Sequence, residues 1–319
     1  MQRNRIISII FGLICTQGIA QQEAQLTQFM YHRMAYNPAY AGASDAPQLS
    51  AATRQQWIGF NGAPSTQLLT FDMPFLSKRL GIGLNLNNQI KGLESKQTIG
   101  LAWSYALAKT NNWSVRGGLQ MSMRRYGMDF KQAFMTTPIA EDYSVGQNFE
   151  TQWVGNFGGG LYATWHDWYL GIAVPALYQN VIGIIKNAPT PIVATEQRHL
   201  FGMGGFSVPL SDKLVAKCNG LFKYAVNSTW TIDANTNFVY DEQLTVGLTY
   251  RTGQKTWSRF PESIDILLFM NLNKHLSLGV SYDVVLSPMA AQQKGSLEMS
   301  MFYHWKKPIL QLSNPRGFF

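Results

Sequence analysis

Hydrophobic and polar positions alternate strictly between residues 79 and 107. Leu80, Ile82, Leu84 and Leu86 fall on one face of the first arm, and the positions between them are glycine or asparagine. A second arm, residues 99–107, repeats the pattern. Arms of about ten residues match strands that cross a bilayer at a tilt, whereas globular strands usually have about five or six residues. The pattern therefore predicts two transmembrane β-strands with one face toward lipid and one toward water.

The alternation recurs along the chain and predicts an all-β fold, a transmembrane antiparallel β-barrel of about 14 strands. The expected strands begin near Gln48, Thr66, Leu80, Gln97, Trp113, Asn156, Trp168, Arg198, Lys213, Ser228, Gln243, Ser263, His275 and Ser296. Tight polar turns such as residues 77–79 and 273–274 alternate with long connections such as residues 126–155 and 177–197. Outer-membrane barrels show short periplasmic turns and long external loops.

A large soluble β-sandwich also has alternating strands and is the competing fold. Long strands with aromatic residues near their ends, among them Trp57, Trp113, Trp165 and Trp305, favour the barrel because such residues form girdles at membrane interfaces. An open sheet edge would leave unpaired backbone groups in lipid, so we expect the sheet to close.

The N-terminal residues have the pattern of a secretory signal peptide. Arg3 and Arg5 precede the apolar run 6–14, and Gly18-Ile19-Ala20 supplies small residues, so residues 1–20 are expected to be removed after Ala20. The apolar run is too short to span a membrane as a helix. Cleavage would leave Cys218 as the remaining cysteine, which excludes an intrachain disulfide and a cysteine metal cluster.

Residues 21–46 form a segment of different character before the predicted barrel, residues 47–306. Leu26, Phe29, Met30 and Met34 have roughly helical spacing, which predicts a short helix or irregular arm that ends at Asn37-Pro38. Two interpretations remain open: a loosely docked periplasmic arm, or a plug that fills the barrel mouth. Residues 307–319 are expected to form a periplasmic C-terminal tail.

Four motifs in this part of the chain occur in a specific order: Gln28-Phe29-Met30-Tyr31, Asn37-Pro38-Ala39-Tyr40-Ala41-Gly42, Arg54-Gln55-Gln56-Trp57-Ile58-Gly59 and Gly62-Ala63-Pro64-Ser65-Thr66. Together they resemble the N-terminal signature of the PorP/SprF family, and Asn314-Pro315-Arg316-Gly317-Phe318-Phe319 is similar to the usual C-terminus of that family. His32-Arg33-Met34 departs from the more apolar residues common there. The resemblance assigns a structural or partner-binding role to Asn37, Pro38, Tyr40, Gly42, Arg54, Trp57, Gly59, Gly62, Pro64, Pro315, Arg316 and Phe319.

The resemblance implies a non-enzymatic outer-membrane component of the type IX secretion and gliding machinery of Bacteroidetes. Its expected partners are periplasmic and outer-membrane components of that machinery, C-terminal domains of secreted cargo or adhesins, and outer-membrane lipid. Its expected role is to support export or surface anchoring of cargo by protein-protein contacts. The barrel alone would suggest the alternative, a diffusion pore for small solutes, because about 14 strands can enclose water.

Charged residues within the predicted strands are expected to face the barrel lumen, since a basic side chain facing lipid at mid-depth costs about 2 to 4 kcal/mol. They are Arg54, Asp72, Arg116, Arg124, Asp233, Arg251, Asp283, Glu298 and His304. Two interpretations are a mutually paired, solvated lumen and a substrate path. Asp265 shares its face with Leu267 and Phe269, so the inner side of this strand is expected to pack against the N-terminal arm.

Composition and motifs give little support for other functions. The chain is 46% hydrophobic and 14% charged with a formal net charge of +8, but its basic residues are scattered singly, which argues against nucleic-acid binding. There is no Gly-x-Ser-x-Gly elbow, and the histidines do not pair at metal-ligand spacing. We therefore expect no cofactor, no metal and no enzymatic activity. Gly158-Gly159-Gly160 is expected to let a strand bend or to admit a neighbouring backbone.

Overall fold

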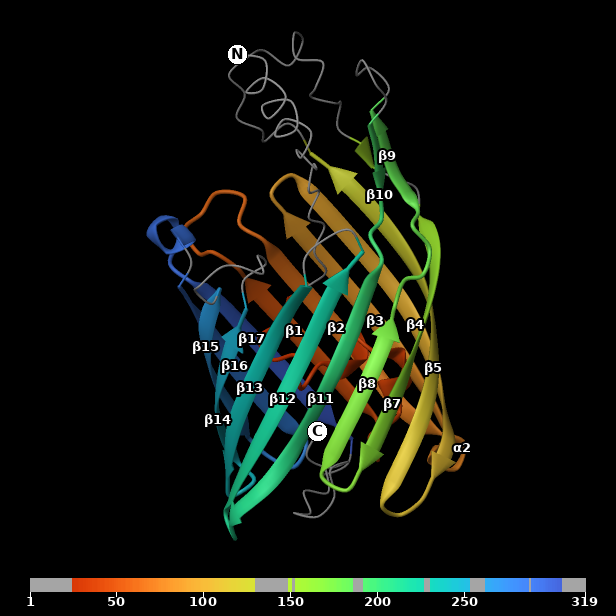
Figure 1. Ribbon diagram of the computed structural model, residues 1–319, viewed down its shortest axis with the longest axis vertical. Helices are drawn as coiled ribbons and strands as arrows, with labels where there is room; N and C mark the ends of the chain where they lie inside the picture. Colours follow the sequence, from red (N-terminus) through yellow and green to blue (C-terminus); the bar gives the residue numbers. More distant parts are fainter. Residues whose placement is uncertain are drawn as a thin grey trace, which may run out of the picture.

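The computed structural model of the 319-residue chain describes residues 25–129, 149–150, 153–185, 192–226, 230–252, 262–286 and 288–305. Within them, 14 antiparallel strands close into a barrel (Figure 1), which confirms the predicted fold. The barrel strands are β1 (Gln48–Gln55), β2 (Ser65–Phe75), β3 (Leu80–Lys91), β4 (Glu94–Lys109), β5 (Trp113–Met128), β7 (Val154–Trp165), β8 (Trp168–Val174), β11 (His199–Ser211), β12 (Leu214–Ala225), β13 (Trp230–Tyr240), β14 (Leu244–Arg251), β15 (Ser263–Asn271), β16 (Leu276–Val285) and β17 (Ser296–His304).

The first and last strands join to close the sheet. Gln48 of β1 pairs with Asp72 of β2 on one side and with His304 of β17 on the other. Every barrel strand thus has two neighbours. The sheet therefore has no free edge with unpaired backbone groups. This closure excludes the soluble sandwich. Three short strands lie outside the ring: β6 (Phe149–Glu150) extends the pairing of β5, and β9 (Val181–Ile185) pairs with β10 (Ile192–Thr195).

Side chains alternate between an exposed outer face and a buried inner face. On β4, a strand of 16 residues, Ile99, Leu101 and Trp103 are exposed, whereas the intervening Gly100 and Ala102 are buried. This arrangement follows from the period-two pattern, because successive side chains of a strand point to opposite faces of the sheet. The apolar outer face can then meet lipid while small residues line the interior.

The two ends of the barrel differ in their connections. At the turn end, tight connections follow β4, β7, β11, β13 and β15, and the short helix α2 (Leu76–Arg79) links β2 to β3. At the loop end, connections include those after β1, β5, β8 and β14. Aromatic residues gather on the outer wall near the turn end, where Tyr105, Trp113, Trp165, Trp168 and Tyr240 are all exposed. Such a ring is typical of a membrane interface.

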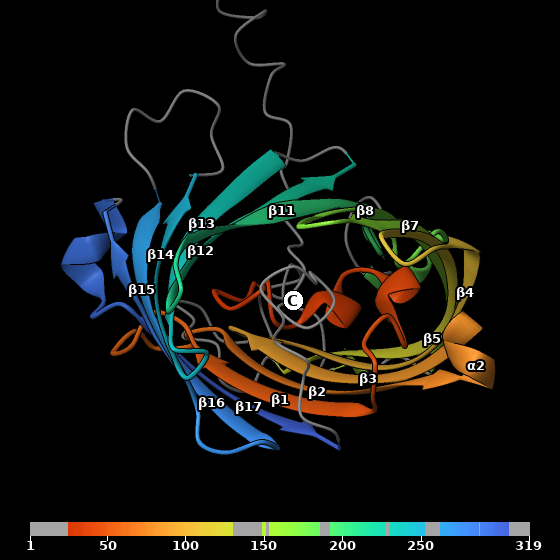
Figure 2. The ribbon, with the colours of Figure 1, turned by 90° about the horizontal axis from the view of Figure 1, so that it is seen from below.

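The N-terminal arm, residues 25–46, lies inside the ring of strands, where Figure 2 shows it in red and orange. It contains two 3₁₀ helices, Arg33–Ala35 and Pro38–Tyr40; a third, Pro288–Gln292, lies between β16 and β17. The first 3₁₀ helix ends at Ala35, shortly before Asn37-Pro38, and the rest of the arm is irregular apart from the second 3₁₀ helix. Asn37 caps the second 3₁₀ helix, because its side-chain oxygen accepts a hydrogen bond from the backbone of Ala39. Within the described ranges, no helix has the length and apolarity needed to cross a membrane.

Candidate functional site: an arm anchored inside the barrel

The arm passes through the barrel from the loop end to the turn end. At its start, the side chain of Gln25 accepts a hydrogen bond at 3.2 Å from Gln56, which follows β1 at the loop end. At its finish, the backbone N–H of Gly42 donates to Asp72 at 3.2 Å, close to the turn end of β2. The carbonyl of Pro47 then accepts from the backbone of Trp305 at 3.2 Å, just as β1 begins.

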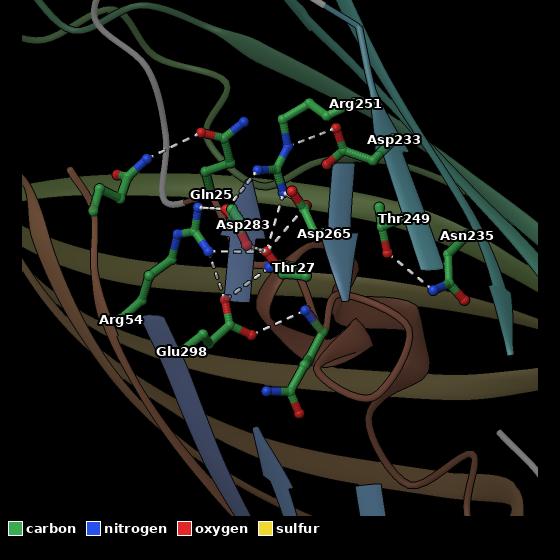
Figure 3. Close-up of polar contacts among 12 residues, drawn as sticks. Gln25, Thr27, Arg54, Asp233, Asn235, Thr249, Arg251, Asp265, Asp283 and Glu298 are labelled. Atoms are coloured by element: carbon green, nitrogen blue, oxygen red, sulfur yellow. Dashed lines mark hydrogen bonds and ion pairs between the residues drawn. The ribbon is translucent and has the colours of Figure 1, made fainter. Parts of the chain in front are cut away.

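An ionic cluster on the inner wall near the loop end surrounds the start of the arm (Figure 3). The guanidinium of Arg54 lies 2.5 Å from Asp283 and 3.3 Å from Glu298. The cluster continues through Arg251, which pairs with Asp233 at 3.1 Å, Asp265 at 3.3 Å and Asp283 at 3.1 Å, and through Lys223, which lies 2.7 Å from Asp233. We call Arg54, Lys223, Asp233, Arg251, Asp265, Asp283 and Glu298 the ionic cluster. Both arginines and all four carboxylates are almost completely buried, so each charge depends on its partners.

The arm enters this cluster through Thr27 and Gln28. The two carboxylate oxygens of Glu298 accept hydrogen bonds from the backbone N–H groups of these residues, at 2.7 and 2.9 Å. The hydroxyl of Thr27 donates to Asp283 at 2.8 Å and accepts from Arg54 at 2.9 Å. Hydrogen bonds to an ionised acceptor are stronger than neutral ones, and buried N–H groups require such partners. Glu298 therefore fixes the backbone of the arm to the last strand.

Aromatic packing holds the middle of the arm. The ring of Tyr31 stacks on Phe269 with 4.3 Å between ring centroids, and the ring of His32 lies 4.7 Å from that of Phe302. The inner side of β15 thus packs against the arm, as the shared face of Asp265 and Phe269 predicts.

Arg33, further along the arm, lies in an aromatic enclosure. Its guanidinium lies 4.0 Å from the ring centroid of Tyr169 and 5.6 Å from that of Tyr40, and it donates a hydrogen bond at 2.9 Å to the hydroxyl of Tyr162. Arg33 is only 2% exposed. A cation placed over aromatic faces is stabilised by their quadrupoles, and more strongly when water is excluded. This contact explains how the chain accommodates a basic residue inside the barrel.

The turn end of the arm makes backbone contacts with the wall. The carbonyl of Ala41 accepts hydrogen bonds from Ser104 at 2.6 Å and Arg116 at 3.3 Å. A Cβ on Gly81 would overlap the Ala41 carbonyl, and a Cβ on Gly118 would overlap the backbone of Ala39. Glycine at these two wall positions therefore permits the close approach of the arm. The side chain of Asn37 also donates to the carbonyl of Leu161 at 2.9 Å.

The segment after β1 forms a shaped connection at the loop end. Trp57 has φ of +47°, and Gly59 and Gly62 have φ of +89° and +72°. The backbone of Ile58 exchanges hydrogen bonds of 2.8 Å with Gly295 and Lys294, and Gly62 accepts from Gly92 at 2.9 Å. Pro64 completes the hairpin by accepting from the backbone of Gln56 at 2.9 Å. The structure therefore joins this connection to two neighbouring ones.

The structure places the remaining residues singled out from sequence as follows. Asp72, Arg116 and Arg124 are buried on the inner wall, where Arg124 pairs with Glu196. Pro38 and Tyr40 are buried in the arm with Asn37 and Gly42. The expected signal peptide, residues 1–20, and the tail residues Pro315, Arg316 and Phe319 lie outside the described residues.

Sequence reasoning missed Thr27 and Lys223. It named Gln28 only as part of a motif and Asp265 only as an inward residue, and it assigned neither to the ionic cluster. The signal available for Asp265 was a carboxylate at an inward position of a strand. For Thr27, no local pattern distinguishes an anchoring residue from other polar ones.

The charged groups of the interior pair with one another and with the arm. The acidic groups are neutralised by arginine and lysine, and the described residues contain no group of three His, Cys, Asp or Glu side chains suited to a metal ion. What the arrangement can do is hold an extended polypeptide segment across a barrel through main-chain and side-chain contacts.

A sequence model of the family described as "Type IX secretion system membrane protein PorP/SprF" matches residues 18–303. The chain belongs to the PorP/SprF family. It is thus a component of the type IX secretion system located in the outer membrane, and its family implies interaction with other components of that machinery. A comparison with curated proteins finds no match.

Solved outer-membrane proteins share the barrel fold. The CymD monoaromatic hydrocarbon channel has a TM-score of 0.51 and 11% identity, with 91% of this chain and 95% of that chain covered. A deletion mutant of the TodX monoaromatic hydrocarbon channel has a TM-score of 0.50 and 10% identity, with 85% of this chain and 93% of that chain covered. At these identities the likeness extends to the fold alone.

Proposed function

We propose that this PorP/SprF protein is a non-enzymatic component that supports export or surface anchoring of cargo by protein-protein contacts. The observation that carries the proposal is the anchored arm: residues 25–46 occupy the interior and are tied to the wall at both ends. A barrel occupied by its own polypeptide is poorly suited to free diffusion of solutes. In this proposal, the barrel presents rigid surfaces at its two ends to which partner proteins bind.

The proposed partners are periplasmic and outer-membrane components of the machinery at the turn end, and C-terminal domains of cargo or adhesins at the loop end. The connection containing Trp57, Gly59, Gly62 and Pro64 supports an external role, because backbone hydrogen bonds hold it in shape while Phe60 at its tip is 39% exposed. Exposed aromatic residues on rigid loops often dominate binding interfaces. The sequence motif Pro315-Arg316 to Phe319 remains the proposed periplasmic contact, with outer-membrane lipid around the barrel.

A diffusion pore is the alternative function, and two measurements on the full-length protein distinguish them. The protein purified from membranes should retain machinery partners and should show little conductance in a planar bilayer. Deletion of residues 21–36 removes the loop-end anchor and most of the arm, and it should raise conductance. Porin-like conductance of the intact protein without any retained partner would refute the proposal.

The proposed surfaces are tested separately. Replacing Trp57 and Pro64 together should impair cargo display while the barrel still shifts mobility on heating, and deleting residues 313–319 should weaken capture of periplasmic components. If cargo display falls only in proportion to folded barrel, the Trp57 connection has a structural role alone. If the tail deletion retains every partner, the periplasmic contact lies elsewhere.

A further inference from the structure

The outer wall of the barrel carries a groove of about 790 Å³ across β16, β17 and β1 to β4. Figure 2 shows β16, β17 and β1 to β3 side by side along one wall of the ring, and β4 pairs with β3. Its apolar floor contains Ala51, Leu69, Leu86 and Ile99, which are cross-strand neighbours in one row. Ala51 is small, and its cross-strand neighbours Met301 and Leu69 have larger side chains. A concavity of this volume is within the range of sites for small ligands.

A polar row borders this floor toward the loop end. Thr53, Gln67, Asn88 and Gln97 are successive cross-strand neighbours on the same outward face, and all line the groove. The amide of Asn88 donates to the side-chain oxygen of Gln67 at 2.7 Å. Arg125 of β5 is the next cross-strand neighbour of Gln97 and adds a positive charge to the row.

The polar row lies near the loop-end boundary of the apolar band of the barrel. Gln97 is eight residues from Tyr105 of the turn-end aromatic ring, which corresponds to about 26 Å along the strand and about 20 Å in height for a strand tilted by about 40°. The apolar band of such barrels is about 25 Å tall. The floor of the groove is therefore within the hydrocarbon, and the row of amides lies close to the loop-end boundary of the hydrocarbon, within reach of a headgroup.

This polarity is specific to one wall. On β14, β15 and β16, the outward residues within one or two positions of the loop end are Tyr250, Ile264 and Val284, and these are exposed and apolar. A boundary location alone therefore does not require a row of amides. On β1 to β4, the apolar floor and the polar row lie within a single groove. Arg125 continues the polar row on β5.

We propose that this groove is a binding site for an outer-leaflet lipid. Its acyl chain occupies the apolar floor at Ala51 and Leu86, and its anionic headgroup lies against the amides of Asn88 and Gln97 with Arg125 nearby. The groove lies on the outer wall and not in the barrel interior. The test of lipid binding is therefore independent of the test of the function proposed above. It would fix the orientation of this wall in the membrane.

Native mass spectrometry of the full-length protein in detergent, titrated with lipid A, tests the proposal. The intact protein should bind one lipid A molecule more tightly than phosphatidylcholine. Ala51→Trp, which fills the floor, and Gln97→Leu, which removes an amide while keeping the strand, should each reduce lipid A binding at least fivefold. Ala234→Trp is the matched control, because Ala234 is an exposed outward residue of β13 on another wall, and it should bind as the intact protein does.

Heat-dependent mobility on gels identifies variants that fold, and Gln97→Leu keeps the test decisive if Ala51→Trp does not fold. Equal lipid A binding by the groove variants and Ala234→Trp would overturn the proposal, because binding would then be nonspecific. It would also be overturned if lipid A showed no preference over phosphatidylcholine, or if a co-purifying protein occupied the groove and was released by Ala51→Trp.

Discussion

Glu298, on the last strand of the barrel, accepts a 2.7 Å hydrogen bond from the backbone N–H of Thr27, which is 271 positions earlier in the chain. The same carboxylate pairs with Arg54 of the first strand. One buried side chain therefore connects the arm to both strands of the closing seam. Formation of this contact couples the position of the arm to closure of the barrel.

Replacing Glu298 with glutamine should loosen the arm and destabilise the barrel. The glutamine side chain would keep a similar shape but would remove the negative charge opposite Arg54, and loss of one partner from a buried ion pair costs about 3 kcal/mol. The unfolding midpoint of Glu298→Gln in denaturant should fall accordingly, and trypsin should cleave after Arg33. Glu94→Gln is the matched control, because Glu94 is exposed at the β3–β4 connection. Unchanged protection of Arg33 would show that Glu298 does not hold the arm.

Gly117 and Gly118 provide a paired test of the contact between the arm and the barrel wall at the turn end. A Cβ at Gly118 would overlap the backbone of Ala39, whereas a Cβ at Gly117 would meet Leu107 at an ordinary 3.5 Å. Gly118→Ala should therefore cost about 1 to 3 kcal/mol through overpacking, and Gly117→Ala should change stability by less than about 0.5 kcal/mol. Denaturant unfolding measures both. Equal effects of the two substitutions would attribute the loss to strand propensity rather than to contact with the arm.

The barrel was predictable from sequence because a bilayer imposes strict alternation on every strand. Leu101 and Trp103 must face lipid while Gly100 and Ala102 face inward, and a shift of one residue would reverse all of them. The barrel strands begin within a few residues of the positions expected. The apolar residues Leu26, Phe29 and Met30 also indicated an arm that must bury itself, and all three are 1–2% exposed in the structure.

The anchoring contacts of the arm could not be predicted in the same way. Thr27 and Glu298 are distant in sequence and share no periodic pattern, so their contact follows only from closure of the ring. The enclosure of Arg33 by Tyr40, Tyr162 and Tyr169 likewise joins the arm to two strands. Such contacts depend on tertiary arrangement rather than on local preference.

The orientation of the barrel in the membrane is predicted from the lengths of its connections. Outer-membrane barrels have long loops on the external side and short turns on the periplasmic side. Residues 126–155 and 177–197 should therefore lie outside the cell, and residues 77–79 and 273–274 should face the periplasm. This would place the Thr27 anchor near the outer surface and the Ala41 contacts near the periplasm.

Single cysteines in a Cys218→Ser background test this orientation, because Cys218 is the remaining cysteine after the expected cleavage. Ser144→Cys in the first long loop should react with a membrane-impermeant maleimide on intact cells. Lys274→Cys, at an exposed turn, should react only after the outer membrane is permeabilised, which also shows that the thiol itself is accessible. Labelling of Lys274→Cys but not Ser144→Cys on intact cells would invert the barrel, and the loop connection containing Trp57 would then be a periplasmic surface.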